Sequence, residues 1–279
     1  GPSIYLGGAF TTVNGSARNF AAAVNPTTGV PTAWDPNFGN TVESLATDGT
    51  YVYATGWFQT VNGATTRNYA AAVDAATATA TTWNPDLNDN GWVVAADSDG
   101  AFVGGDFTSA NAGAARNNAA AIDLRTGVVT AWNPNFNDYV NTLEISGSTV
   151  YVGGAFLTAN GGTGRNRAAA VDTTTGTLTG WNPNFNNVVN DLELSGSTAY
   201  IVGDFTTANG GPVRNRAAAV DLTAGTVTGW NPNLNAGASS IGISGSTVYL
   251  AGSFTTANGG TTRNRAAAVD STNGTLTGW

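Results

Sequence analysis

Residues 133–181 read NPNFNDYVNTLEISGSTVYVGGAFLTANGGTGRNRAAAVDTTTGTLTGW, and variants of this 49-residue phrase fill almost the whole chain. Its final tryptophan returns at the same interval, at Trp34, Trp83, Trp132, Trp181, Trp230 and Trp279. A fixed period of this length is the signature of a repeat protein, in which each unit buries its apolar faces against its neighbours. The function therefore has to be sought in a scaffold that the repeats share.

Each repeat predicts four short strands and no helix. Residues 140–146 alternate apolar and polar side chains with the period of two that marks a half-buried strand. Residues 149–156 are rich in β-branched and aromatic side chains, which favour a second strand. Alanine-rich residues 168–172 suit a helix by propensity, but the run is short and turn residues follow it, so we predict a third strand. A fourth is expected at residues 177–181.

Glycine and proline punctuate these strands. The Gly153-Gly154 pair predicts a close approach of neighbouring backbone at the end of the second strand. The Ser-Gly-Ser turn at residues 146–148 places glycine where a tight hairpin needs positive φ. Pro183 follows Trp181 by two residues and cannot donate to a ladder, so it ends the fourth strand. The Asn-Gly segment between the second and third strands is expected to be a loop.

Four strands in about 45 to 50 residues is the pattern of one β-propeller blade. The sequence therefore predicts an all-β fold, a six-bladed β-propeller of four-stranded antiparallel blades. The Gly-Gly strand end, the variable loop and the phrase AVDTTTG at residues 170–176 resemble kelch and quinoprotein repeats. The chain is also similar to Thr/Gly/Asn-rich propeller repeats of secreted bacterial proteins. That resemblance implies a scaffold and no activity. Trp181 lies one residue later than in the quinoprotein phrase, which predicts its ring at a strand end or on the opposite face.

The first repeat begins at its second strand, so the first blade is expected to lack one strand. Residues 1–3 read Gly-Pro-Ser and resemble the scar of a protease cleavage, an expression-tag remnant, which leaves residues 4–279 as a single propeller domain. An open sheet edge is a template for pairing with another chain. We therefore expect a homodimer through the open edge of the first blade.

Composition narrows the classes of function. The net charge is −8 and all ten cations are arginine, whereas binding a phosphate backbone needs clustered cations, so nucleic acid is not an expected partner. Histidine and cysteine are absent, which excludes a Ser-His-Asp triad and a thiol nucleophile. A paired-carboxylate glycosidase remains as an alternative, with Glu43, Glu144 and Glu193 as the chain's three glutamates.

The chain offers no motif for a cofactor and no apolar run long enough for a membrane span. The acidic loops at residues 86–90 and 97–100 lack the spacing of a calcium loop, so no metal site is predicted. A surface rich in Thr, Asn and Gly and free of lysine favours an extracellular or cell-surface location.

Two tryptophans and three arginines are the candidate ligand-binding residues. Trp57 and Trp92 break the repeat pattern, and an exposed indole offers a stacking face to a sugar ring. Arg167, Arg216 and Arg265 come two residues after the loop-end arginines of the last three repeats and would present guanidinium groups to a carboxylate or a sulfated sugar.

For the residues that recur in every repeat, a structural role is favoured. The repeated tryptophans are expected to be wedges between blades. The loop-end arginines are expected to pair with strand-end aspartates, for example Arg165 with Asp172 or Asp221.

The sequence thus predicts a non-catalytic extracellular scaffold or binding module with a glycan or protein ligand. The alternative is the propeller domain of a secreted carbohydrate-active enzyme whose catalytic parts lie elsewhere.

Overall fold

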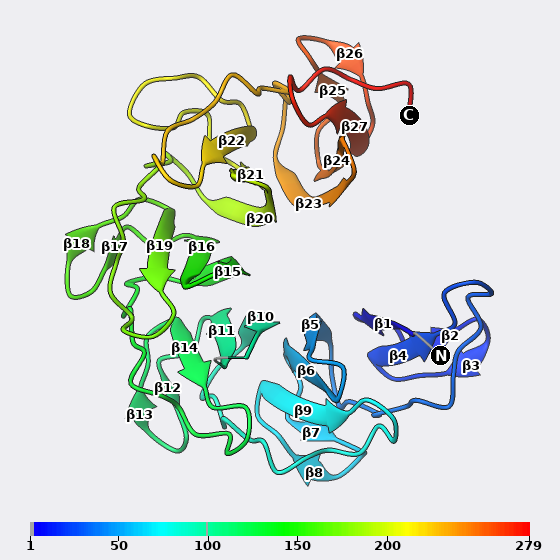
Figure 1. Ribbon diagram of the computed structural model, residues 1–279. Helices are drawn as coiled ribbons and strands as arrows, with labels where there is room; N and C mark the ends of the chain where they lie inside the picture. The colour runs from blue at the N-terminus through cyan, green and yellow to red at the C-terminus, as the bar shows by residue number, and fades with distance from the viewer. Residues whose placement is uncertain (1–2, 99) are drawn as a thin grey trace. The chain divides into compact units, whose positions relative to one another are not determined.

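The computed structural model describes residues 3–98 and 100–279. The chain divides into two compact units, Gly1–Asn135 and Phe136–Trp279, which are blue to green and green to red in Figure 1. Both units consist of antiparallel sheets joined by turns. The first two residues of the predicted tag remnant and Asp99 lie outside the described residues.

Each repeat forms one main sheet, two-stranded in the first repeat and three-stranded in the others. In the first unit the sheets are β1 (Ile4–Gly7) with β4 (Ala21–Val24), then β5 (Val42–Thr47), β6 (Tyr51–Gly56) and β9 (Ala70–Asp74), then β10 (Gly91–Ala96), β11 (Ala101–Gly105) and β14 (Ala119–Ile122). In the second unit they are β15 (Val140–Ser146), β16 (Thr149–Gly154) and β19 (Ala168–Asp172), then β20 (Val189–Ser195), β21 (Thr198–Gly203) and β22 (Ala217–Asp221), then β23 (Ala238–Ser244), β24 (Thr247–Gly252) and β27 (Ala266–Asp270).

The Asn-Gly segment that the sequence predicted as a loop contains a small hairpin in five repeats. Its paired strands are β2 (Thr12–Val13) and β3 (Ser16–Ala17), β7 (Thr60–Val61) and β8 (Thr65–Thr66), β12 (Ser109–Ala110) and β13 (Ala114–Ala115), β17 (Thr158–Ala159) and β18 (Thr163–Gly164), and β25 (Thr256–Ala257) and β26 (Thr261–Thr262). In the fifth repeat a single bridge between Thr207 and Val213 replaces it, because Pro212 has no N–H to donate.

The fourth strand is shorter than predicted. Residues 177–181 make a single bridge, Val171 to Leu178, instead of a ladder. Side chains take the place of a strand at its outer edge: the Leu178 N–H donates to Asn160 Oδ1 at 3.0 Å, and the Thr179 carbonyl accepts from Arg165 at 2.9 Å. An edge whose N–H and C=O groups are already bonded offers little to another chain.

A β-bulge recurs at the start of the first strand of each three-stranded sheet. The register shifts between Val140 and Thr142 in β15, and equally in the other four. The residues at the shift are Glu43, Trp92, Asn141, Asn190 and Ser239. Opposite the bulge, a Cβ on Gly154 would lie 2.2 Å from the Tyr139 carbonyl oxygen, which confirms the predicted close approach of backbone.

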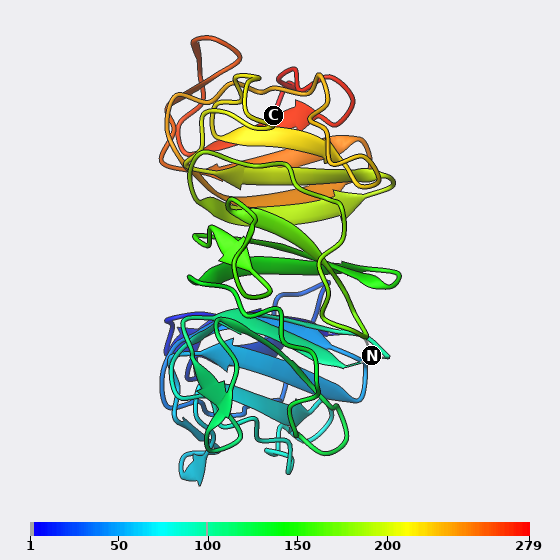
Figure 2. The same cartoon turned by 90° about the vertical axis from the view of Figure 1, so that its left-hand side faces the viewer.

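Five of the six repeated tryptophans are buried as the predicted wedges, whereas Trp279 is 64% exposed and is not one: the five are Trp34, Trp83, Trp132, Trp181 and Trp230. Trp181 is 2% exposed, packs edge-on against Tyr151 with ring centroids 5.2 Å apart, and donates from Nε1 to the Asp221 carbonyl of the next repeat at 3.0 Å. Burying such a ring contributes about 4–6 kcal/mol as an upper figure. Figure 2 shows the sheets of the second unit stacked one on the next. The apolar cluster that contains Trp181 joins side chains of the fourth and fifth repeats.

Candidate functional site

The candidate site is a patch in the second repeat, the rim patch, made of Glu43, Trp57, Gln59 and Tyr69. Trp57 directly follows β6, and its N–H donates to the Thr41 carbonyl at 2.9 Å. This backbone anchor projects the indole outward, where it is 46% exposed. Its Nε1 donates to Glu43 Oε1 at 2.9 Å, so the carboxylate on the bulge of β5 fixes the ring edge and leaves a face of the indole accessible.

Tyr69 completes the rim patch from the start of the third strand. It adopts the left-handed conformation with φ of 61°, and its N–H donates to the Phe58 carbonyl at 2.8 Å. Its phenol accepts from Gln59 Nε2 at 3.0 Å. The rim patch therefore combines a large aromatic face with a carboxylate, an amide and a phenol, a set suited to a flat ligand that carries several hydroxyl groups.

The second to sixth repeats all have these positions, and the predicted ligand residues fall on them. Trp92 occupies the bulge position of Glu43 in the next repeat, and Arg167, Arg216 and Arg265 occupy the position of Tyr69 in the last three repeats. All three arginines have the left-handed conformation, with φ of 68°, 68° and 70°. They also precede the third strands, which begin at Ala168, Ala217 and Ala266, so their side chains do not follow strand alternation.

The three arginines differ in how far they are already engaged. Arg167 Nη1 donates to the Ala155 carbonyl. Arg216 Nη1 donates to the Asp204 carbonyl and lies 3.8 Å from Asp204 Oδ1. Arg265 is exposed. Their ligand-binding role stays a prediction, and Arg265 has the guanidinium most accessible to a ligand.

The loop-end arginines have the predicted structural role but not the predicted partners. Arg165 does not pair with Asp172 or Asp221; it donates to the carbonyl oxygens of Gly164 and Thr179. A planar guanidinium donates along several directions, so it can join two backbone carbonyls at once. The same two contacts recur for Arg18, Arg67, Arg116, Arg214 and Arg263.

Trp92 differs from Trp57 in its surroundings. It lies within β10 and is half-buried, next to Gly91, whose Cα faces Thr55 and the Tyr69 carbonyl of the second repeat. Of the two tryptophans, Trp57 presents the more exposed indole.

Three carboxylates gather on the first strands of the second unit. Asp191 accepts from Thr142 Oγ1 at 3.1 Å, the Leu192 N–H at 2.9 Å and the Ile241 N–H at 3.0 Å, so it ties three neighbouring strands together. Burial and then the charges of Glu193 and Asp191 raise the pKa of Glu144 to about 7. Glu144 and Glu193 occupy equivalent positions in β15 and β20, whereas Glu43 lies in the rim patch with Trp57.

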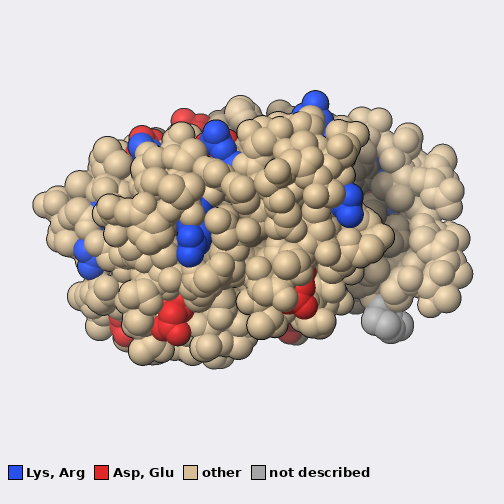
Figure 3. All heavy atoms as spheres, turned by 90° about the horizontal axis from the view of Figure 1, so that it is seen from above, with Lys and Arg blue, Asp and Glu red and all other residues tan. Residues whose placement is uncertain are grey.

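On the face shown in Figure 3 the charged side chains are sparse and the arginines lie apart from one another. Within residues 3–98 and 100–279, no group of three or more acidic side chains is placed to hold a metal ion. None of the described chain forms a helix with the length and apolarity needed to cross a membrane.

No family model matches the chain, and no curated protein matches its sequence. Solved structures that are similar in fold include the following two. The computationally designed protein Ika8 matches with a TM-score of 0.61 at 13% identity, over 92% of this chain and 66% of that one. The WD40 domain of Neurospora crassa Pan2 matches with a TM-score of 0.54 at 12% identity, over 82% of this chain and 65% of that one. The chain thus spans about two thirds of the length of each.

WD40 domains are propellers of four-stranded blades. The chain folds as a β-propeller. Sequence identities of 12–13% support a shared fold and nothing further. The kelch and quinoprotein resemblance and a secreted bacterial origin therefore stay predictions.

Sequence reasoning missed Gln59 and Tyr69, and it considered Glu43 only as a glycosidase carboxylate. At the positions of Glu43, Gln59 and Tyr69, no other repeat has the same residue type. The same is true of Trp57. A concentration of such departures within one repeat is the signal that points to the patch.

Proposed function

We propose that this propeller is a non-catalytic binding module that takes its ligand at the rim patch. A propeller fold suits a scaffold or protein-interaction role in general. The observation that supports a specific site is the 46% exposed indole of Trp57, which Glu43 holds by its edge at 2.9 Å. An indole fixed before binding loses little conformational entropy when a ligand arrives.

The proposed ligand is a glycan presented outside the cell. One face of a pyranose ring is apolar and its rim carries hydroxyl groups, so the ring stacks on Trp57 while Glu43, Gln59 and the Tyr69 phenol meet the hydroxyls. The lysine-free surface rich in Thr and Asn supports an extracellular location for such a module.

A glycan array probed with the intact chain tests this proposal. We expect selective binding that Trp57→Ala abolishes and Trp279→Ala leaves intact, because Trp279 is also exposed, at 64%, but lies outside the rim patch. Binding that survives Trp57→Ala and is lost in Arg216→Ala would move the site to the arginines. Hydrolysis of a chromogenic glycoside that Glu144→Gln abolishes would overturn the non-catalytic assignment.

We also propose that β1 pairs with a second copy of the chain. Among the described residues β1 pairs with β4 on one side alone, and Ile4 on this strand is 49% exposed. Sedimentation velocity should show a mass that rises with concentration and returns to the monomer value in Ile4→Lys. A mass independent of concentration would contradict this pairing.

A further inference from the structure

A tyrosine in the second strand of several repeats ties that repeat to the next one. Tyr200 donates from its phenol to the Ser271 carbonyl at 2.8 Å, and Tyr151 donates to the Leu222 carbonyl at 3.3 Å. Tyr5 makes the same contact with Ala75 at 3.3 Å. In each case the acceptor directly follows the last residue of the next repeat's third strand or its equivalent.

Tyr53 is the equivalent tyrosine of the second repeat, and its phenol points elsewhere. It donates to Asp48 Oδ2 at 3.0 Å, within its own repeat. A phenol has one hydrogen to donate, so the equivalent carbonyl, that of Leu124, receives none from Tyr53. The cause is in the hairpin turn: Asp48 stands where the fourth and fifth repeats have Ser146 and Ser195.

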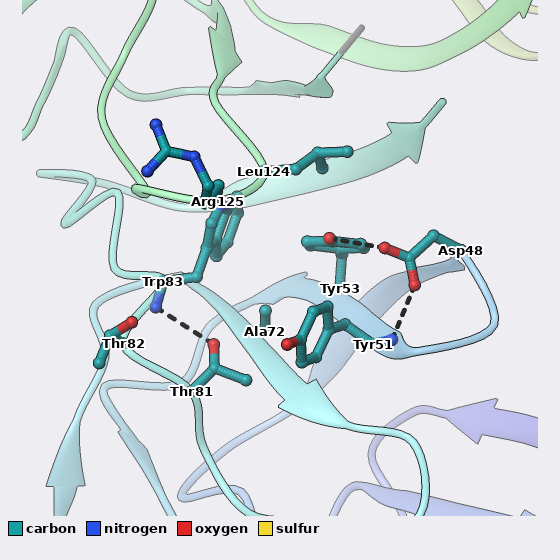
Figure 4. A pocket seen from close by; sticks show the side chains of 9 residues that line it. All are labelled: Asp48, Tyr51, Tyr53, Ala72, Thr81, Thr82, Trp83, Leu124 and Arg125. Carbon is teal, nitrogen blue, oxygen red and sulfur yellow. Dashed lines mark hydrogen bonds between the residues drawn. The ribbon is translucent and has the colours of Figure 1, made fainter. Parts of the chain in front are cut away.

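A pocket of about 240 Å³ lies at this altered contact, inside the first unit. Figure 4 shows the rings of Tyr51, Tyr53 and Trp83 around it, with Asp48 at one end. Arg125 lines the opposite end, and its guanidinium extends away from Asp48 in this view. Tyr53 and Trp83 pack edge to face with centroids 5.4 Å apart, so the aromatic wall is held in place.

The Asp48 end of the pocket is rich in hydrogen-bond acceptors. Burial raises the pKa of Asp48, but N–H donation from Tyr51 and Thr50 and the Tyr53 phenol outweigh it, and the net effect lowers that pKa. Asp48 is therefore a carboxylate at neutral pH. Burial and the same carboxylate raise the pKa of Tyr53, which keeps its proton directed at Asp48.

We propose that this pocket, the Asp48 pocket, binds an organic ammonium group. A fixed carboxylate beside aromatic rings is the arrangement that attracts a desolvated cation, through its charge and through the ring quadrupoles. The chain's net charge of −8 adds a favourable field for cations and an unfavourable one for anions. The pocket is independent of the rim patch, so either site can fail without the other.

The geometry favours a cation over two other ligand classes. An anion would meet Asp48 at close range, with Arg125 at the far end as its one charged partner. A neutral sugar would gain nothing from a full negative charge beside the ring walls. The size of the pocket suits a single headgroup rather than a chain of residues.

Isothermal titration calorimetry of the intact chain tests the proposal with two cations and one neutral control. The cations are choline, a quaternary ammonium, and butylammonium, a primary ammonium with the shape of a lysine side chain. The neutral control is dimethylbutanol, which matches choline in shape but has no charge. We expect at least one cation to bind about tenfold more tightly than dimethylbutanol. Which cation binds better distinguishes a methylated headgroup from a lysine-like source.

Three variants complete the test. Asp48→Asn should weaken cation binding about tenfold, whereas Glu43→Gln, which changes the net charge equally at the distant rim patch, should leave it unchanged. Arg125→Gln removes a like charge and should strengthen binding a few-fold. Tyr51→Ala removes a half-buried ring from the pocket and should weaken cation binding. It replaces Asp48→Asn as the test if Asp48→Asn lowers the melting temperature.

Equal binding of choline and dimethylbutanol would overturn the proposal, because it would show that the Asp48 pocket binds apolar groups without regard to their charge. Cation binding that weakens in Arg125→Gln would also overturn it, because removing a positive charge near a bound cation should strengthen binding. Cation binding that Asp48→Asn leaves unchanged in a folded protein would place the ligand elsewhere.

Discussion

Glu144→Gln should stabilise the protein at alkaline pH and have little effect in acid. Burial and the neighbouring charges of Glu193 and Asp191 raise the pKa of Glu144 from 4.5 to about 7. The folded protein therefore retains a proton there that the unfolded chain has already lost. Between those two pH values the folded state binds more protons than the unfolded state, so the free energy of unfolding falls as pH rises.

The size of the effect follows from that displacement. A change from 4.5 to about 7 corresponds to roughly 3.4 kcal/mol for a group removed from water. Solvent reaches part of the half-buried Glu144 side chain and screens it, which reduces the figure to about 1–2 kcal/mol. Glutamine has the same shape without the charge. Above pH 7 the variant therefore lacks the free-energy cost that the charged Glu144 imposes on the folded wild type, and below pH 4.5 neither protein has that cost.

Thermal unfolding of the wild-type and variant chains at pH 4 and pH 8 measures this difference. We expect Glu144→Gln to raise the melting temperature at pH 8 by roughly 2–8 °C and to leave it nearly unchanged at pH 4. Glu43→Gln is the matched control, because it makes the same substitution at an exposed position. An equal gain at both pH values, or a loss at pH 8, would refute the assigned electrostatic strain.

Two further predictions concern the repeat itself. Gly154→Ala should destabilise the fold by more than about 2 kcal/mol in denaturant unfolding, since its Cβ would lie 2.2 Å from a fixed backbone oxygen. Gly180→Ala is the control: its Cβ would have no atom within 4 Å, so stability should change by less than about 0.5 kcal/mol. Similar denaturation midpoints for both variants would contradict the close approach. Asn209→Ala should cost about 1–3 kcal/mol, because the amide accepts from the Val227 N–H at 2.7 Å, donates to the Gly225 carbonyl at 3.0 Å, and sits at a φ of 47° that alanine disfavours. An unchanged denaturation midpoint in this variant would show that the amide does not hold the fourth segment.

The sequence predicted the parts of the fold that depend on local patterning. The first strand at Val140–Ser146 and the third at Ala168–Asp172 have the predicted bounds, since alternation and turn residues define them. The close backbone approach at Gly154 and the wedge role of Trp181 were also predictable, because a residue that recurs once per repeat takes one structural role.

The sequence could not predict contacts that depend on three-dimensional competition. Acidic residues were the expected partners of Arg165, but its guanidinium donates to the backbone carbonyls of Gly164 and Thr179. The contact with Thr179, together with Asn160, leaves the fourth segment without a ladder. The left-handed conformation of Arg167 is equally invisible in sequence, because arginine has no preference for it.

The candidate sites depended on departures from the repeat. Trp57 stood out because its residue type is unique at that position. The Asp48 pocket did not, since Asp48 and Tyr53 are each ordinary residues for a turn and a strand. Their significance lies in the hydrogen bond from the Tyr53 phenol to Asp48, which depends on the folded structure.

The central claim is that the buried repeated tryptophans lock one blade to the next, while Trp57 faces solvent to receive a ligand. Hydrogen exchange of the indole N–H groups, followed by NMR, tests it most directly. Slow exchange is predicted for the wedge indoles, whose Nε1 atoms donate to carbonyl oxygens at 2.9–3.1 Å: Trp34, Trp83, Trp181 and Trp230. Fast exchange is predicted for Trp279, which is 64% exposed, and intermediate exchange for Trp57, which is 46% exposed but donates from Nε1 to Glu43. Wedge indoles that exchange as fast as Trp279 would contradict the account.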